Sequence, residues 1–366
     1  MKNIEEIHAQ LLIDYSVNLK SKEKVCIRGS VACLPLMHSL FDYALTKNAF
    51  PQLKIFDEHA QKVVLKYGNK KQISYVPESE MTLMKDIDVL INIVGSVNVR
   101  HLTNINPAKI KLQNQGKKAV LNTFFTRVKN KELRFAVTLY PTQSDAQEAS
   151  MSLSDYRKLV YNACKLYTDD PAKEWQDVST EQERICSFLN TNKVLHIISS
   201  NTDLTMSIKG RKWINCDGKV NLPDGEIYTG PVEKSVNGYI HFSFPGIYAS
   251  REIGDIHLTF KNGKVVGAKA SKGEDLLLQL LETDKGARYV GEIAIGTNDN
   301  ITQFTKNILF DEKIGGTIHL AIGRSAPESG GLNKSSIHWD MLCDMKKGGE
   351  IYADDELIYK NGKFTI

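Results

Sequence analysis

Two residues that can bind a metal ion, His338 and Asp340, lie two positions apart in the segment 336–342. Apolar residues occupy the alternate positions of this segment, which is the pattern of a half-buried β-strand. We therefore expect His338 and Asp340 to share one face, with Cα atoms about 6.5 to 7 Å apart. An imidazole and a carboxylate at that separation can bind one cation, or one cation each of a pair.

A second segment of the same kind, 317–322, carries His319 on the face opposite its apolar residues. A histidine in that position faces either water or a site. Taken alone, such a residue is more often a hydrogen-bonded structural histidine than a ligand. We interpret His241 and His257, which also lie in strand patterns, in this structural way.

Two Gly-Glu-Ile segments contribute Glu226 and Glu292, each beside a glycine and just ahead of apolar residues. Either glutamate alone is typical of a solvated surface. Together with the two histidines and the aspartate, they form a mixed oxygen and nitrogen donor set. Such a set suits zinc, cobalt or manganese better than calcium or an all-thiolate site.

The first half of the chain alternates helical and strand patterns, which is typical of an α/β domain with a mostly parallel sheet. Apolar residues recur at helical spacing over 4–15 and 34–44. Strands are predicted at 24–28, 53–57, 88–95, 118–124 and 134–140.

The chain has 366 residues, of which 42% are hydrophobic and 25% charged, so two globular domains are expected. Ser152 and Asp155 form a helix-capping pattern, and Pro171 begins a further helix toward Leu189. Beyond it, strand patterns dominate, including a hairpin across Asn262-Gly263. We predict an α/β domain over 1–190 and a strand-rich α+β domain over 191–366 that carries the metal site.

Several functional classes lose support. The sequence has no GxGxxG after a strand, no P-loop and no HExxH motif. A net charge of +4 is small, and the lysine-rich stretch 109–118 lacks interleaved aromatics, so no nucleic-acid partner is expected. No apolar run is long enough to span a membrane, and the amphipathic start does not resemble a signal peptide. The expectation is a cytoplasmic protein without a membrane partner.

A series of longer segments resembles the thermophilic metallo-aminopeptidases of the aminopeptidase T, aminopeptidase S and PepS type. After similar segments at 140–153, these are Gly210-Arg-Lys-Trp, Pro223-Asp-Gly-Glu-Ile-Tyr-Thr-Gly-Pro-Val-Glu, Gly291-Glu-Ile-Ala-Ile-Gly-Thr-Asn, Ile318-His-Leu-Ala-Ile-Gly and Ser336-Ile-His-Trp-Asp. The resemblance covers most of the chain.

The resemblance implies a dinuclear site with Glu226, Glu292, His319, His338 and Asp340 as ligands. It implies two divalent cations, zinc or cobalt first and manganese or magnesium as alternatives. The implied reaction is removal of N-terminal residues from peptides by a metal-activated water, with Glu226 or Glu292 as proton shuttle. It also implies a homodimer in which the partner helps to close the site.

One position departs from this family. Seven residues after the first histidine ligand the family carries a tyrosine, whereas this chain has Ala326. Three explanations stay open: activity is much reduced, the alanine is an engineered inactivation, or Tyr228, Ser325 or water replaces the phenol. A catalytically impaired homologue that binds metal and peptides or a partner protein is therefore the alternative function. A metal-free structural protein would require the five ligand residues to be dispersed in space.

Overall fold

The computed structural model describes residues 3–248 and 251–366. Its contacts divide the chain into two compact units, Met1–Ala172 with Gly218–Pro223, and Lys173–Asp217 with Asp224–Ile366. A boundary at residue 190 would place helix α10, Pro171–Leu189, in the first unit. Nearly all of this helix instead belongs to the second unit. The reason is packing, since Ile185 and Cys186 of α10 are buried in the core of the second unit.

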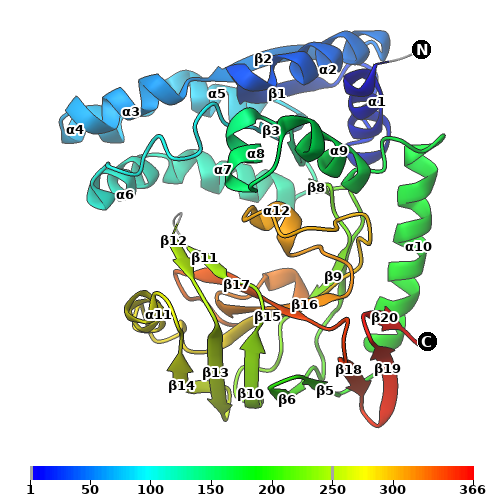
Figure 1. The fold of residues 1–366 in the computed structure, drawn as a ribbon. Helices are drawn as coiled ribbons and strands as arrows, with labels where there is room; N and C mark the ends of the chain where they lie inside the picture. Colours follow the sequence, from blue (N-terminus) through cyan, green and yellow to red (C-terminus); the bar gives the residue numbers. More distant parts are fainter. Residues whose placement is uncertain (1–2, 249–250) are drawn as a thin grey trace. The chain divides into compact units, whose positions relative to one another are not determined.

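The first unit contains a parallel sheet in the strand order β2-β1-β3-β4-β8. Its strands are β1 Lys24–Ser30, β2 Phe50–Phe56, β3 Val89–Val94, β4 Arg134–Leu139 and β8 Asn221–Leu222. Its helices are α1 Ile4–Gln10, α2 Leu34–Thr46, α3 Glu58–Tyr67, α4 Lys70–Ser74, α5 Glu78–Asp86, α6 Pro107–Gly116, α7 Lys118–Lys129, α8 Gln143–Glu148 and α9 Leu153–Ala163; a π-helical turn, Leu11–Ser16, extends α1 and a 3-10 turn, Val31–Cys33, precedes α2. Figure 1 shows these elements in blue to green. The predicted α/β class with a parallel sheet is confirmed.

The segment 118–124 was predicted as a strand, and this is wrong, because it forms the first turns of α7. Val120, Phe124 and Val128 recur every four residues, which is a helical rather than a strand period. They pack with Phe135 of β4 and Met84 of α5. The secondary structure of this short β-branched and aromatic run is ambiguous from the sequence alone. The apolar residues that it packs against favour the helix.

The imidazole of His8 in α1 makes the first unit sensitive to acid. It is fully buried, and its Nε2 lies 2.8 Å from Thr138 Oγ1. Burial lowers the pKa of His8 from 6.5 to about 3. In the unfolded chain His8 is therefore protonated below about pH 6.5, whereas in the folded chain it stays neutral until about pH 3. Stability is lost as the pH falls through this window, by about 1.4 kcal/mol per pH unit.

We expect urea unfolding to show a loss of about 2 kcal/mol between pH 7 and pH 5 that depends on His8. The variant His8→Gln has no titrating group at this position, so its loss over the same range should be smaller by that amount. His38→Gln serves as a control, since His38 is exposed on α2. An unchanged pH dependence in His8→Gln would contradict the assignment.

The second unit consists mainly of two antiparallel sheets that pack face to face. The larger has the order β14-β13-β10-β6-β5-β18-β19-β20, and the smaller, here called sheet C, has the order β17-β16-β15-β9-β7. The strands are β5 Val194–Ser199, β6 Thr202–Ser207, β7 Ile214–Cys216, β9 Glu226–Thr229, β10 Asn237–Phe242, β13 Ile256–Lys261, β14 Lys264–Lys269, β15 Val290–Gly296, β16 Thr317–Gly323, β17 His338–Asp344, β18 Glu350–Ala353, β19 Glu356–Lys360 and β20 Lys363–Phe364. A small hairpin, β11 Gly246–Tyr248 with β12 Arg251–Ile253, helices α11 Glu274–Leu281 and α12 Ile308–Asp311, and a 3-10 turn, Pro327–Ser329, complete the unit.

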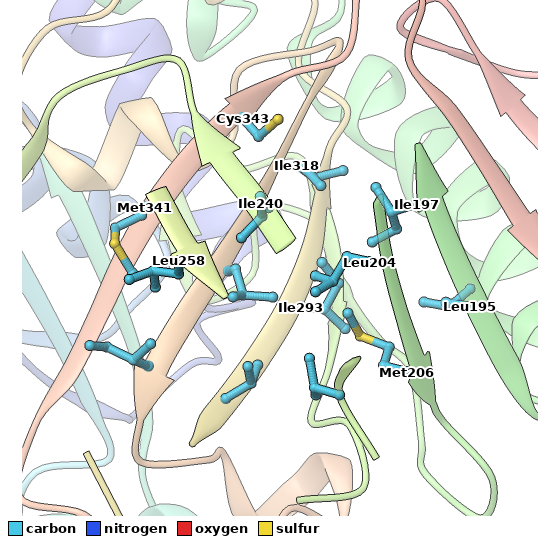
Figure 2. Packing of buried hydrophobic residues seen from close by; sticks show 14 of the residues in the cluster. Leu195, Ile197, Leu204, Met206, Ile240, Leu258, Ile293, Ile318, Met341 and Cys343 are labelled. Carbon is cyan, nitrogen blue, oxygen red and sulfur yellow. The ribbon is translucent and has the colours of Figure 1, made fainter. Parts of the chain in front are cut away.

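The core between the two sheets is apolar on both sides. Leu204, Ile240 and Leu258 of the larger sheet face Ile293 and Ile318 of sheet C (Figure 2). Because side chains alternate along each strand, the other face of sheet C is left for polar residues. The predicted Asn262-Gly263 hairpin between β13 and β14 is confirmed, with both residues at positive φ. In the part of the chain that the structure describes, no helix combines the length and apolarity needed to cross a membrane.

Candidate metal centre

All five residues predicted to bind metal lie on neighbouring strands of sheet C. They are Glu226 on β9, Glu292 on β15, His319 on β16, and His338 and Asp340 on β17. The residues that alternate with them, such as Ile293 and Ile318, are buried in the core on the opposite face. The period of two along each strand and the register between strands together place the five side chains on one face.

His319 is at the centre of this group and is fully buried. Its Nε2 lies 3.3 Å from Glu226 Oε2, 3.3 Å from Glu292 Oε1 and 4.0 Å from Asp340 Oδ1. His338 Nε2 lies 3.4 Å from Asp340 Oδ1. One ligand atom each of Glu292, His319 and Asp340 lies within 4.8 Å of the others, so these three can bind one ion.

Backbone carbonyls orient both imidazoles. His319 Nδ1 lies 3.0 Å from the carbonyl oxygen of Glu312, and His338 Nδ1 lies 2.8 Å from that of Arg324. A carbonyl oxygen can only accept, so each Nδ1 carries the hydrogen and donates it. In the neutral tautomer the lone pair is then on Nε2, which faces the carboxylates, as in histidines that bind metals.

Two carboxylate oxygens in this group are buried and make no hydrogen bond of normal geometry with any described residue, although an imidazole Nε2 lies close to each. They are Glu226 Oε2 and Asp340 Oδ1. A buried carboxylate oxygen without a hydrogen bond is costly, and a bound cation can offset that cost. The residues present therefore fit a bound divalent cation, which would take up these oxygens together with the two Nε2 atoms.

The electrostatics of the group also favour a cation. Burial by itself lowers the pKa of His319, but Glu292 and the other carboxylates outweigh it and raise the pKa to about 9. Asp340 in the same way raises the pKa of His338 to about 10 against the effect of burial. Burial raises the pKa of Glu226 to about 8. The carboxylates thus hold protons on both imidazoles, and a divalent cation would replace those protons.

Lys313 is a site residue that the sequence analysis missed. It is fully buried, and its Nζ lies 3.1 Å from Glu226 Oε1, 3.9 Å from Asp224 Oδ1 and in contact with Glu312. Burial opposes its charge, but the three carboxylates outweigh burial and raise the pKa of Lys313 well above its ordinary value. Lys313 thereby holds one oxygen of Glu226 and leaves the other facing His319. Nothing in the local sequence marks this lysine.

Asp224 could have been found, because it precedes Glu226 by two residues and can share its face. Together with Cys216 of β7 these two residues form another group of possible ligands, one ligand atom each within 4.8 Å. Cys216 pairs with Glu226 in the register of β7 and β9. Burial and the neighbouring carboxylates raise the pKa of the Cys216 thiol, so it keeps its proton beside Lys313.

Ala326 lies at the start of a short 3-10 turn, and its methyl group cannot hydrogen-bond. Of the groups considered as replacements, Tyr228 projects from β9, and its hydroxyl donates to Glu328 Oε1 over 3.0 Å. Burial, with help from nearby acidic groups that include Glu292, raises the pKa of Tyr228. Ser325 Oγ is buried with no hydrogen-bond partner among the described residues.

His241 and His257, interpreted as structural, stack face to face on β10 and β13 with ring centroids 4.2 Å apart. Asp255 Oδ1 lies 2.8 Å from His241 Nε2, which matches a hydrogen-bonded role. One ligand atom each of the three residues lies within 4.8 Å of the others, and the group is partly exposed. It is a further place in this unit where the described side chains could bind a cation.

A mostly buried set of carboxylates and imidazoles on one face of a sheet is the donor set of a metal centre. The chain belongs to the M29 family of thermophilic metalloproteases, whose family model matches residues 2–364. It is therefore a metallopeptidase, a hydrolase that acts on peptide bonds. The expected family is confirmed.

Two curated relatives illustrate this membership. Aminopeptidase AmpS of Bacillus subtilis (strain 168) is 26% identical over 408 aligned positions, covering 98% of each chain. Aminopeptidase T of Thermus thermophilus is 28% identical over 231 positions, covering 56% of this chain and 55% of that protein.

Two solved structures share the fold. Wild-type AmpT from Thermus thermophilus superimposes with a TM-score of 0.86 at 20% identity, covering 99% of both chains. A 2,5-dihydroxypyridine dioxygenase from Pseudomonas putida KT2440 superimposes with a TM-score of 0.61 at 13% identity, covering 99% of this chain and 96% of that one. The fold thus occurs in proteins named for two different reactions, and family membership rather than fold supports peptide hydrolysis.

Proposed function

We propose that this protein removes N-terminal residues from short peptides, using two divalent cations held by Glu226, Glu292, His319, His338 and Asp340. The observation that supports this most directly is a pair of buried oxygens without a hydrogen bond of normal geometry, Glu226 Oε2 and Asp340 Oδ1, which lie 3.3 and 3.4 Å from the Nε2 atoms of His319 and His338. The oxygen and nitrogen donor set favours zinc or cobalt, with manganese or magnesium as alternatives.

Divalent cations bound here would polarise the peptide carbonyl and lower the pKa of water to near neutrality. The proton that the water loses needs an acceptor. Lys313 already holds one oxygen of Glu226, whereas the described residues give the Glu292 carboxylate only His319 as a hydrogen-bond partner. We therefore assign proton transfer to Glu292 and a fixed binding role to Glu226.

A homodimer in the cytoplasm is part of this proposal. An exopeptidase must reject chains that extend past the amino end of its site, and a second copy of the chain could supply that barrier.

Removal of metal is the direct test. After dialysis against a strong chelator, we expect release of N-terminal residues from tripeptides to stop, and added zinc or cobalt to restore it. Elemental analysis should then find two equivalents per chain. N-acetylated versions of the same peptides serve as a matched control, since an aminopeptidase leaves them intact. An undiminished rate in chelator, with no metal retained on reconstitution, contradicts the proposal.

A second candidate function is a catalytically impaired homologue that keeps its metals and binds peptides or a partner protein. The observation that favours it is Ala326, which has no group to donate to a developing oxyanion. In the active enzyme the Tyr228 hydroxyl would replace the missing phenol, whereas in the impaired homologue no group replaces it.

A further inference from the structure

The first unit has a cavity of about 680 Å³ on one face of its parallel sheet. Strands β1 to β4 form its floor, and α5, α7 and the segment 75–77 line its sides. Helix α2 packs on the opposite face, where Gly29 approaches Met37. All residues that line this cavity belong to the first unit.

A row of polar side chains crosses the floor of the cavity. In the sheet register Arg28 pairs with Lys54 on one side and with Asn92 on the other, so the three share one face on adjacent strands. They lie in the second half of strands of six or seven residues, toward the carboxyl ends. In open parallel sheets this is the end at which ligands bind.

Three of the lining side chains lack a protein partner. Arg28, Asn92 and Lys117 make no side-chain hydrogen bond or ion pair within 3–248 and 251–366, although each is partly buried. Lys54, in contrast, is paired with Glu80. Burial lowers the pKa of Lys117, and the neighbouring charge of Arg28 adds to that effect. Two like charges are therefore held close together without a counter-ion of their own.

Apolar and aromatic side chains form the rest of the wall. They include Phe56, Leu90, Phe124, Phe135 and Val137. The one lining carboxylate besides Glu80 is Asp57, whose Oδ1 accepts the backbone N–H of Ala60 at the start of α3. The cavity thus combines two cations that make no ion pair, and an amide, with an aromatic surface, as ligand sites typically do.

We propose that this cavity binds a small carboxylate with an aromatic body. The planar guanidinium of Arg28 suits a two-oxygen carboxylate, Asn92 adds an N–H donor, and Lys117 adds charge. The aromatic walls match a ring of the ligand in size and polarity. No glycine-rich loop follows β1, which argues against a phosphate group as the anion. This site is independent of the metal centre and of the function proposed for it.

Calorimetric titration of the metal-loaded, full-length protein with 3-phenylpropionate tests the proposal. We expect one site per chain, and binding at least about 10-fold weaker for the uncharged 3-phenylpropionamide, because a hydrogen bond to a charged group contributes that much. Arg28→Gln and Lys117→Gln should each weaken 3-phenylpropionate binding by a similar factor. Lys85→Gln, on the exposed side of α5 and outside the cavity, should leave it unchanged.

The metal centre could also attract a carboxylate, so Glu292→Gln is measured in parallel and should retain the binding. Equal affinity for acid and amide, or loss of binding in Glu292→Gln but not in Arg28→Gln, overturns the proposal. Displacement of 3-phenylpropionate by inorganic phosphate at equal concentration overturns the carboxylate assignment. If circular dichroism shows that Arg28→Gln does not fold, Lys117→Gln decides, since its side chain has no partner to lose.

Discussion

Replacement of Glu292 by glutamine is expected to lower the rate of peptide hydrolysis by at least about 100-fold. The substitution keeps the size of a side chain that is nine-tenths buried, but it removes both the negative charge beside His319 and the proton acceptor. Because general-base catalysis and cation binding are lost together, the effect should appear in kcat as well as in bound metal. Initial rates with tripeptides and elemental analysis measure the two parts separately.

Glu282→Gln is the matched control for this change. Its carboxylate lies on the surface, paired with Arg288, and the variant should hydrolyse peptides at the normal rate. The stricter test is the double variant Glu292→Gln, His319→Ala, which removes two of the five proposed ligands. Full activity of that variant, at normal metal content, would refute a metal centre on sheet C.

Replacement of Tyr228 by phenylalanine is expected to have the next largest effect, a loss of about 100- to 1000-fold in kcat. Tyr228 shares β9 with Glu226 and lies on the same face, two residues away. Burial raises its pKa, so its hydroxyl keeps the proton and can donate it to a developing oxyanion at neutral pH. In the present structure the hydroxyl donates to Glu328, an exposed residue that a substrate could displace.

The companion variant Ala326→Tyr separates the two candidate functions. An active enzyme that already uses Tyr228 should gain little from a second phenol. If Ala326→Tyr instead raises the rate by two orders of magnitude or more while Tyr228→Phe changes nothing, chemistry was lost at position 326 and the impaired homologue is the correct description. Tyr352→Phe, which removes a hydroxyl paired with Glu350 on the other sheet, controls for loss of a phenol as such.

The proposed metal centre contains a buried cation of the protein itself, Lys313, in addition to its carboxylates. A fully buried ammonium among Glu226, Asp224 and Glu312 offsets part of their mutual repulsion before any metal binds. The same contact fixes which oxygen of Glu226 remains for His319. Such a pair is costly to break, because either partner would be left buried and uncompensated.

The two strands of sheet C that carry His319 and His338, and the faces of their side chains, could be predicted from the sequence alone. Alternation of apolar and polar residues around His319 and His338 is a local property, and it correctly separates the core face from the polar face. The Asn-Gly turn is local as well, because it depends only on two residues that tolerate positive φ. The family resemblance extended this to all five residues of the proposed centre.

Contacts between segments distant in sequence could not be predicted from local patterns, and only the tertiary structure shows them. Lys313 meets Glu226 across 87 residues of sequence, and no periodicity near either residue predicts that encounter. The row of Arg28, Lys54 and Asn92 exists only because three strands pair in one register. The segment 118–124 is a helix, not the predicted strand, because Phe124 and Val128 find apolar partners at helical spacing. Local patterns determine which face of an element is apolar, whereas strand pairing and packing determine which polar groups meet.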